Sequence, residues 1–254
     1  MKIAVLVKQV PDTATQLRFK PDYSGIVSEG VKFIISPYDE FALEEALRMK
    51  EKAGSGEVIV LTVGPDRVQE ALRNCLAMGA DQAIWIKAEE GSVDPYLTAV
   101  LLSKKLDLLK PDLIWCGRQA ADDDMAYVGG AVAEMLGMPF VSLVTKFEDP
   151  SRVTRQVEGG EEKIEVPLPC VLSAQKGLNE PRYPSLAGMM KAKKKEIETL
   201  NASDLVPDLA SVQKTHLEKL EPPPARPAGK MLSGTPEQMV KELVHLLKDE
   251  AKVL

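Results

Sequence analysis

The sequence predicts an α/β fold with a doubly wound, mostly parallel sheet. Short runs of almost only apolar residues recur along the first two-thirds of the chain, as in strands that are buried on both faces. Amphipathic stretches separate these runs, which is the alternation that right-handed βαβ crossovers produce. The predicted strands are residues 3–7, 58–63, 83–86, 112–116 and 140–144.

The amphipathic stretches carry helix start and stop signals. A helix is predicted after Ser36, because this cap residue is followed by Pro37 and by the acid Asp39 in the first turn. The same spacing of apolar residues predicts three more helices, at 66–78, from about 94–95 onward, and at 125–136 before a glycine.

The pattern changes after Pro150. Residues 152–157 and 163–166 flank Glu158-Gly-Gly-Glu161, which predicts a small β hairpin, and residues 167–173 predict one more strand. The proline-rich segment 221–229 predicts an extended arm, and a capping box at 235–238 begins a last helix. We therefore expect an α/β domain over 1–200 and, over 201–254, a C-terminal arm and helix that pack on another chain.

The composition excludes several classes of function. A net charge of −6 disfavours general nucleic-acid binding. Cys75, Cys116 and Cys170 stand alone in apolar runs, so neither a disulfide framework nor a zinc site is expected. His216 and His245 lie far in sequence from any candidate nucleophile, so no catalytic histidine is expected. With no apolar run of about 18 residues and no signal-peptide core, we expect a reduced, cytoplasmic protein without a membrane span.

A ligand site is expected beyond the carboxyl ends of the strands. Neither GxGxxG nor GxxxxGK[ST] is present, so the usual dinucleotide and P-loop motifs do not apply. The segment 117–130 instead reads GRQAADDDMAYVGG, with small residues at a predicted helix start. Free N–H groups there suit a phosphate, whereas the three acids oppose one. A nucleotide-binding loop and a well-capped helix start therefore both fit.

A second unusual segment spans 174–195. It places Tyr, Leu and Met among basic residues, as in a docking peptide that uses an apolar anchor and steering charges. The alternative is a lysine-rich helix exposed to solvent.

Several motifs together resemble one known family. VKQVPD, GVKFIISPYDEFALEEALRMKE, LAMGAD, GRQAADDDMAYVGG and LNEPRYPSLAGMMKAKKKEIE occur in collinear order over about residues 1–200. They are similar to the β subunit of electron-transfer flavoprotein. The resemblance implies a Rossmann-like, adenine-nucleotide-binding fold and a heterodimer with an α subunit that holds FAD near the interface. It also implies an electron carrier without catalytic residues, which passes electrons from acyl-CoA or related dehydrogenases, as in fatty acid oxidation, to a membrane-associated quinone oxidoreductase.

The resemblance further implies that this subunit binds AMP in a structural role. The cofactor-binding residues implied are Leu6, Ser36, Pro37, Tyr38, Asp39, Val63, Gly117, Arg118, Gln119, Ala120, Ala121, Asp122, Asp123, Asp124, Met125, Ala126, Tyr127 and Val128. Ser36 stands where asparagine is common in the family, and Val63 stands where some members have cysteine. The acidic triplet is shared with AMP-binding members, so its acids are expected to cap and orient the loop.

The segment from Pro181 to Lys191 resembles the recognition loop of the family, with Leu186 as the apolar anchor for a dehydrogenase pocket. The docking residues implied are Pro181, Arg182, Tyr183, Leu186, Met189, Met190 and Lys191. Lys191 and Lys194 align with lysines that are methylated in some mitochondrial members.

An electron-bifurcating branch of the family is the alternative. Its members hold a second FAD in this pocket and take hydride from NADH. Their usual motif is DGDTAQVGP, whereas this chain reads DDDMAYVGG, although VKQVPDT and SPYD resemble that branch. We favour AMP. A stand-alone adenine-nucleotide sensor is a third reading, but it leaves residues 175–254 unexplained.

Overall fold

The computed structural model describes residues 1–149, 152–224 and 228–254. Two compact units make up the chain, Met1–Leu220 and Glu221–Leu254. Pro150, at which the predicted pattern changes, and residues 225–227 of the predicted arm lie outside the described residues. We expected residues 201–254 to be the part of the chain that packs on a partner, and this boundary at residue 200 stays a prediction.

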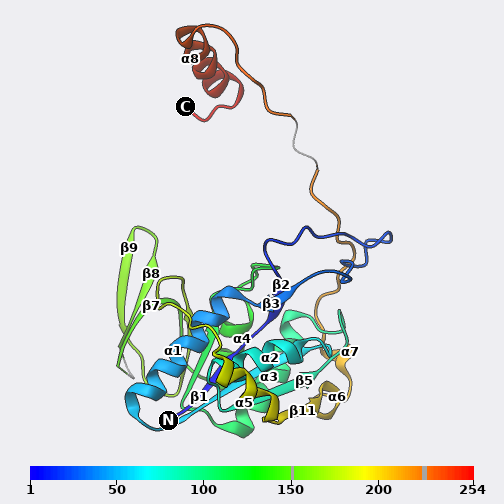
Figure 1. Ribbon diagram of the computed structural model, residues 1–254, viewed down its shortest axis with the longest axis vertical. Helices are drawn as coiled ribbons and strands as arrows, with labels where there is room; N and C mark the ends of the chain where they lie inside the picture. The colour runs from blue at the N-terminus through cyan, green and yellow to red at the C-terminus, as the bar shows by residue number, and fades with distance from the viewer. Residues whose placement is uncertain (150–151, 225–227) are drawn as a thin grey trace. The chain divides into compact units, whose positions relative to one another are not determined.

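The first unit is built on a nine-stranded sheet with the order β11-β5-β4-β1-β6-β10-β7-β8-β9 (Figure 1). All strands from β11 to β7 run parallel to their neighbours, and β8 and β9 continue the sheet antiparallel. This confirms the predicted α/β class with its mostly parallel sheet. The bounds are β1 Lys2–Leu6, β4 Glu57–Gly64, β5 Gln82–Lys87, β6 Leu113–Gly117, β7 Phe140–Asp149, β8 Arg152–Val157, β9 Gly160–Glu165, β10 Cys170–Ala174 and β11 Ile197–Asn201.

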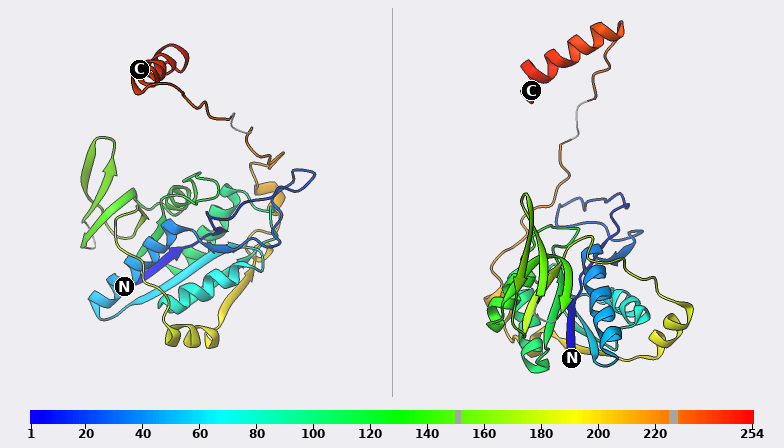
Figure 2. Two further views of the ribbon diagram at one scale, coloured as in Figure 1. Left: turned by 45° about the horizontal axis from the view of Figure 1, so that its top comes forward. Right: turned by 90° about the vertical axis from the view of Figure 1, so that its left-hand side faces the viewer.

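Helices cover both faces of the sheet (Figure 2). Alternate residues of β1 divide between two cores: Ile3 and Val5 pack with α1 and α2, while Ala4 and Leu6 pack with α3 and α4. Residues 3–6 of β1 are all apolar, and the strand therefore buries both of its faces, as the sequence pattern predicted. The helices are α1 Pro37–Ala53, α2 Val68–Met78, α3 Pro95–Leu109, α4 Val128–Leu136, α5 Leu186–Lys194, α6 Ala202–Leu205 and α7 Leu209–Val212.

Some boundaries differ from the predicted ones for identifiable reasons. The helix expected from residue 125 begins at Val128, because Asp124 and Ala126 adopt φ values of 52° that an α-helix cannot contain. The strand expected from residue 167 begins at Cys170, because Pro167 and Pro169 have no N–H to donate to a ladder.

Several elements had no clear sequence signal. A separate two-stranded sheet pairs β2 (Gln9–Pro11) with β3 (Phe33–Ile35), and β11 adds an edge strand beside β5. The segment 186–194 forms the helix α5, so the lysine-rich helix that we held as an alternative is present within the expected docking segment. The predicted hairpin is confirmed as β8–β9.

The second unit contains the predicted terminal helix. Thr235 and Gln238 form the expected capping box at the start of α8 (Pro236–His245), and a π-helical turn, η1 (Leu246–Glu250), extends it. Val240, Leu243 and Val244 are exposed on this helix. None of the described helices combines the length and hydropathy that a membrane crossing needs.

Candidate functional site

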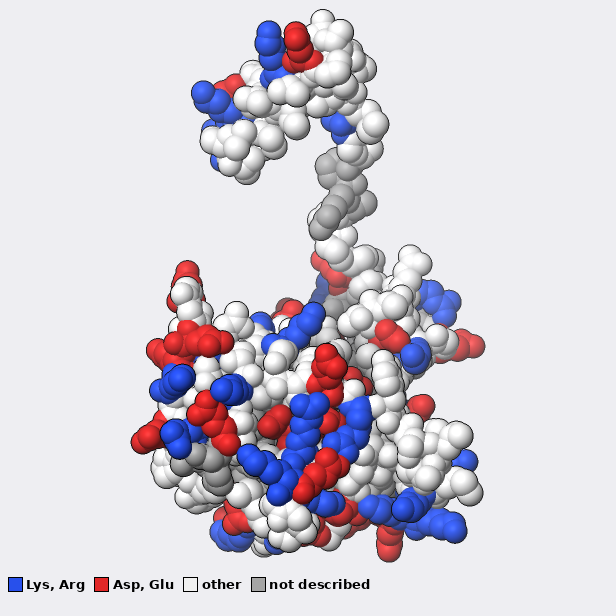
Figure 3. Space-filling model, turned by 60° about the vertical axis from the view of Figure 1, so that its left-hand side comes forward, with Lys and Arg blue, Asp and Glu red and all other residues white. Residues whose placement is uncertain are grey.

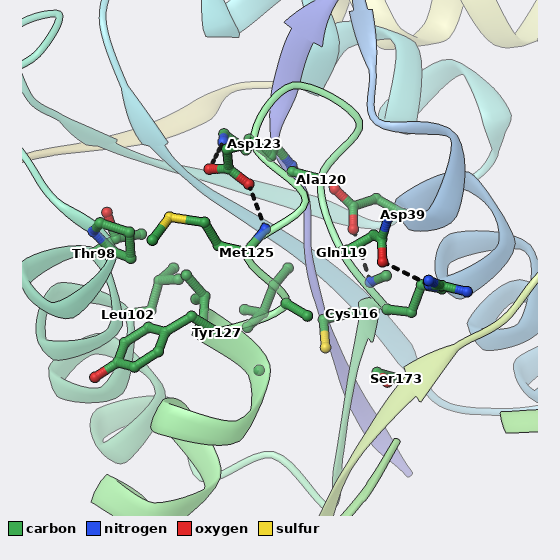
Figure 4. A pocket seen from close by; sticks show the side chains of 18 of the residues that line it. Asp39, Thr98, Leu102, Cys116, Gln119, Ala120, Asp123, Met125, Tyr127 and Ser173 are labelled. Carbon is green, nitrogen blue, oxygen red and sulfur yellow. Dashed lines mark hydrogen bonds and ion pairs between the residues drawn. The ribbon is translucent and has the colours of Figure 1, made fainter. Parts of the chain in front are cut away.

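A cavity of about 240 Å³ opens at the carboxyl edge of the parallel sheet (Figure 4). The ends of β1, β4 and β6 form its floor, and the first turns of α3 and α4 form its walls. This is the edge at which open parallel sheets bind their ligands. The structure brings these predicted residues together in its lining: Leu6, Asp39, Val63, Gly117, Arg118, Gln119, Ala120, Asp123, Met125, Ala126, Tyr127 and Val128.

The other predicted residues lie outside this lining. Ser36 is fully buried and leads into α1. The ring of Tyr38 lies 5.3 Å from the guanidinium of Arg118, measured from the ring centroid to Cζ. Pro37, Ala121, Asp122 and Asp124 are the remaining predicted residues outside the lining, and Asp122 and Asp124 are exposed.

The prediction missed some residues of the lining. Lys8, Asp94, Thr98, Leu102, Cys116, Phe140 and Ser173 are the main ones. Lys8 directly follows a predicted strand and belongs to VKQVPD, so a signal for it was present. The α3 residues are separated in sequence from every motif, and only the order of the strands brings them to this edge.

Asp39 connects two neighbouring strand ends beneath the cavity. Its Oδ2 accepts a hydrogen bond from the backbone N–H of Lys8 at 2.8 Å, and its Oδ1 accepts one from Gly117, also at 2.8 Å. Burial raises the pKa of this carboxyl to about 7, although the two N–H groups act in the opposite direction. Asp39 is therefore a structural part of the pocket floor with an unusual proton affinity.

Lys8 neutralises the acids that had opposed a phosphate. Its Nζ lies 2.8 Å from one carboxylate oxygen of Asp122 and 2.8 Å from one of Asp123. Burial acts to lower the pKa of Lys8, but these two carboxylates outweigh it and hold the pKa above its ordinary value. Asp123 also accepts from the N–H of Met125, and Asp124 accepts from Gln119 at 2.5 Å. The acidic triplet thus orients the loop.

Close packing fixes the backbone on both sides of the loop. A Cβ on Gly117 would collide with Oδ1 of Asp39 and would lie 2.7 Å from Cβ of Tyr38. A Cβ on Gly129 would lie 2.5 Å from Sγ of Cys116, so the first turn of α4 packs directly on β6. The first N–H groups of a helix have no partner within it, and small side chains leave those of α4 accessible to an anion.

Asp94 joins the wall of the cavity to a later part of the same unit. Its Oδ1 caps α3 by accepting from the N–H of Leu97 at 2.7 Å. Its Oδ2 accepts from the N–H groups of Lys214 and Thr215, each at 2.8 Å, and from the Thr215 hydroxyl. Burial acts to raise the pKa of Asp94, but these donors together lower it. The segment at 214–215 is therefore fastened beside the cavity.

The predicted docking segment exposes a group of large apolar side chains. Tyr183 is 94 % exposed, Leu186 79 % and Met190 69 %, while Met189 is exposed to a lesser degree. Lysines gather over the last turn of α5, where Lys191 and Lys194 lie (Figure 3). Apolar side chains beside basic ones are the composition of a docking surface.

This segment is nevertheless held rigidly. A Cβ on Gly188 would collide with the carbonyl oxygen of Ala77, so α5 packs closely on the end of α2. Arg73 donates to the carbonyl oxygens of Ala192, at 2.6 Å, and of Lys195. Exposed anchors on a fixed backbone lose little conformational entropy when a partner binds.

Pro181 and Arg182 lie at the start of the docking segment and are only half-exposed. Arg182 turns inward, where it forms ion pairs with Glu44 and Glu51 of α1. These ion pairs hold the start of the docking segment against α1.

Comparison with known proteins decides the family. The family model described as electron transfer flavoprotein domain matches residues 24–205. A mouse protein named electron transfer flavoprotein subunit beta is 42 % identical over 259 residues, covering 100 % of this chain and 99 % of its own. A relative of the same name from Bacillus subtilis is 41 % identical, and the match covers 100 % of both chains. Another, from Thermoanaerobacterium thermosaccharolyticum, is 43 % identical over 97 % of this chain and 98 % of its own. The chain belongs to the electron transfer flavoprotein β-subunit family.

Membership confirms the resemblance seen in the motifs and makes the chain a subunit of an electron transfer flavoprotein, a heterodimer with an α subunit. The three thiols of this β subunit are buried and free, and burial raises their pKa, that of Cys170 to about 11. Within residues 1–149, 152–224 and 228–254, no three His, Cys, Asp or Glu side chains are grouped to hold a metal ion.

Proposed function

We propose that this β subunit is the AMP-holding half of an electron-carrying αβ heterodimer. FAD, held mainly by the α subunit, supplies the redox chemistry by accepting electrons from a reduced dehydrogenase and passing them on. The donors we propose are acyl-CoA or related dehydrogenases, and the acceptor is a membrane-associated quinone oxidoreductase. The observation that carries the proposal is the cavity at the carboxyl edge of the sheet, in a chain of this family.

The size of the cavity supports a mononucleotide. At about 240 Å³ it lies just below the roughly 300–1,000 Å³ range of pockets for drug-sized ligands, so a mononucleotide matches it more closely than the much larger FAD does. Gly117, Ala120 and Gly129 line the cavity without long side chains. At Gly117 and Gly129 the missing Cβ lets the loop and α4 pack closely on α1 and β6. The start of α4 suits a phosphate, and Lys8 balances the nearby acids.

The docking segment supports a protein donor of electrons. Tyr183, Leu186 and Met190 present apolar surface to solvent, and the lysines of α5 lie beside them. A partner with an apolar pocket and an acidic rim would complement both features. Three free thiols are typical of a reducing compartment, and we propose a cytoplasmic location.

The direct test is the nucleotide content of the purified heterodimer. The chain is co-expressed with its α partner, the complex is extracted with acid, and AMP and FAD are quantified by chromatography. One AMP and one FAD per heterodimer support the proposal. Two FAD with reduction by NADH would instead establish the bifurcating alternative, which VKQVPDT and SPYD favour at the sequence level. A complex with FAD but an empty second site would refute the AMP assignment.

A further inference from the structure

Among the residues that the structure describes, Asp39 is the one side chain that bonds to the backbone just beyond β1 and at the end of β6. The two strands are neighbours in the sheet, with Ile3 opposite Leu113 and Val5 opposite Trp115. Beyond these pairs the strands separate into Lys8 on one side and the loop from Gly117 on the other. Each oxygen of Asp39 accepts one backbone N–H, from Lys8 and from Gly117. The carboxylate thus closes the gap at the position where the cavity begins.

The surroundings of Asp39 favour a change of protonation near neutral pH. The side chain is buried at the start of α1, and burial raises its pKa to about 7. Two charged groups act on it, the ammonium of Lys8 and the carboxylate of Asp122. The Nζ of Lys8 forms its ion pairs with Asp122 and Asp123, and the hydrogen bond from Lys8 to Asp39 comes from the backbone N–H.

Two thiols and one further acid also face this region. Cys75 of α2 and Cys116 of β6 both interact electrostatically with Asp39, and burial holds the pKa of each thiol far above neutral pH. Glu40 follows Asp39 on the same helix, and burial raises its pKa as well. The thiols therefore stay neutral in the range in which Asp39 titrates.

We propose that Asp39 is a positioning residue that latches the nucleotide loop to the end of β1 when it is ionised and releases it when it is protonated. The inference deepens the proposed function, since the loop that it holds lines the proposed AMP cavity. An ionised carboxylate offers an acceptor to each N–H, whereas a protonated one turns one oxygen into an O–H donor. One of the two N–H groups then faces a hydroxyl oxygen, which is a much weaker acceptor than a carboxylate oxygen, and its strand end is held less firmly.

Ionisation of Asp39 improves this local geometry although it does not raise the overall stability. Placing a charge in the protein interior costs more than the two hydrogen bonds return, which is why the carboxyl resists ionisation. The latch therefore acts on the position of the loop.

The first experiment reads the latch directly through amide hydrogen exchange. The heterodimer is exchanged between pH 5.5 and 8.5, and rates are corrected for the intrinsic pH dependence of exchange. Peptides that contain the amides of Lys8 and Gly117 should be protected about tenfold more at the upper end, since a hydrogen bond to a charged group is lost below it. Asp39→Asn should keep the low protection at every pH, and the matched control Glu40→Gln should behave as the wild type.

The second experiment measures how much AMP the heterodimer retains after dialysis over the same pH range. The wild type should lose AMP as the pH falls below about 7, and Asp39→Asn should lose it at every pH. Greater retention at low pH would overturn the latch, because it would show Asp39 acting as a like charge against the phosphate. A pH-independent exchange pattern would overturn it too. Absence of AMP at every pH, together with pH-dependent exchange, would refute the proposed function and leave the latch intact.

Discussion

Arg182 donates two hydrogen bonds to the carboxylate of Glu44, from Nε to Oε2 at 2.8 Å and from Nη2 to Oε1 at 3.1 Å. The same guanidinium reaches Glu51, one Nη2–Oε2 distance being 3.0 Å. Glu44 and Glu51 lie on α1, the helix whose first turn carries Asp39. The helix α1 therefore positions both Asp39 in the floor of the cavity and Arg182 at the start of the docking segment.

Replacing Arg182 with Gln should loosen the docking segment. Burial acts to raise the pKa of Glu44, but bonds from Arg182 and Arg48 hold it below its ordinary value, so the carboxylate is ionised at neutral pH. Loss of the guanidinium leaves this buried charge with Arg48 alone, at a cost of roughly 1–3 kcal/mol. Faster hydrogen exchange over residues 181–190 is the expected result. Lys176→Gln, at an exposed site in the same connection, is the control. Equal exchange in both variants would contradict the fastening role.

Leu186→Ala should slow electron transfer from the donor dehydrogenase without changing the FAD content. An exposed leucine that enters a partner's pocket acts as an anchor worth ~2 kcal/mol or more. The measurement is the dependence of the transfer rate on dehydrogenase concentration. Leu108→Ala removes a similarly exposed leucine, 73 % against 79 %, from the surface of α3 and should have no effect. If the two variants transferred electrons equally well, Leu186 would not be the anchor.

The sequence was sufficient for the parts of the fold that depend on local patterns. The apolar runs become central strands such as β1 and β4, and the capping box at Thr235 starts a helix. The edge strand β11 was missed because only Ile197 and Leu200 among its five residues are partly covered, which leaves no continuous apolar run. The start of α4 was misplaced because alanine rarely adopts a left-handed φ, so nothing in the sequence indicates the φ value of 52° at Ala126.

The candidate site was predictable where residues follow a strand directly. The loop from Gly117 and the turn at Asp39 carried recognisable motifs, and both line the cavity. The wall formed by Thr98 and Leu102 was not predictable, because these side chains look like any apolar helix face. The contact between Arg182 and Glu44 was missed as well, because the two residues are distant in sequence. An arginine beside a tyrosine is typical of exposed surface.

Gly117→Ala should lower the nucleotide content of the heterodimer. The added Cβ collides with Oδ1 of Asp39 and presses on Tyr38, so either the loop or the start of α1 must move. Overpacking of this kind costs typically ~1–3 kcal/mol. AMP per heterodimer and the urea midpoint of unfolding are the measurements. Gly160→Ala is the matched control, because nothing lies within 4 Å of its added Cβ. Normal AMP content in Gly117→Ala would show that the loop tolerates displacement.

Asp39 should give the chain a stability that declines as the pH rises toward neutrality. Its folded pKa of about 7 exceeds the ordinary carboxyl value of 3.8, so between these values the folded state binds the proton more tightly than the unfolded state does. The contribution to the free energy of unfolding is complete below pH 3.8 and is lost as the pH rises through 7.

Asp39→Asn removes this ionisation, and the difference in unfolding free energy between wild type and variant isolates it from all other titrating groups. The wild type should lose at most about 4 kcal/mol relative to the variant across the whole window. Most of the change accessible to urea titrations falls between pH 5 and 7.5, and the difference should be constant above pH 8. A difference that grows in favour of the wild type as the pH rises would mean that the two N–H groups of Lys8 and Gly117 outweigh burial. In that case Asp39 would stay ionised throughout the neutral range.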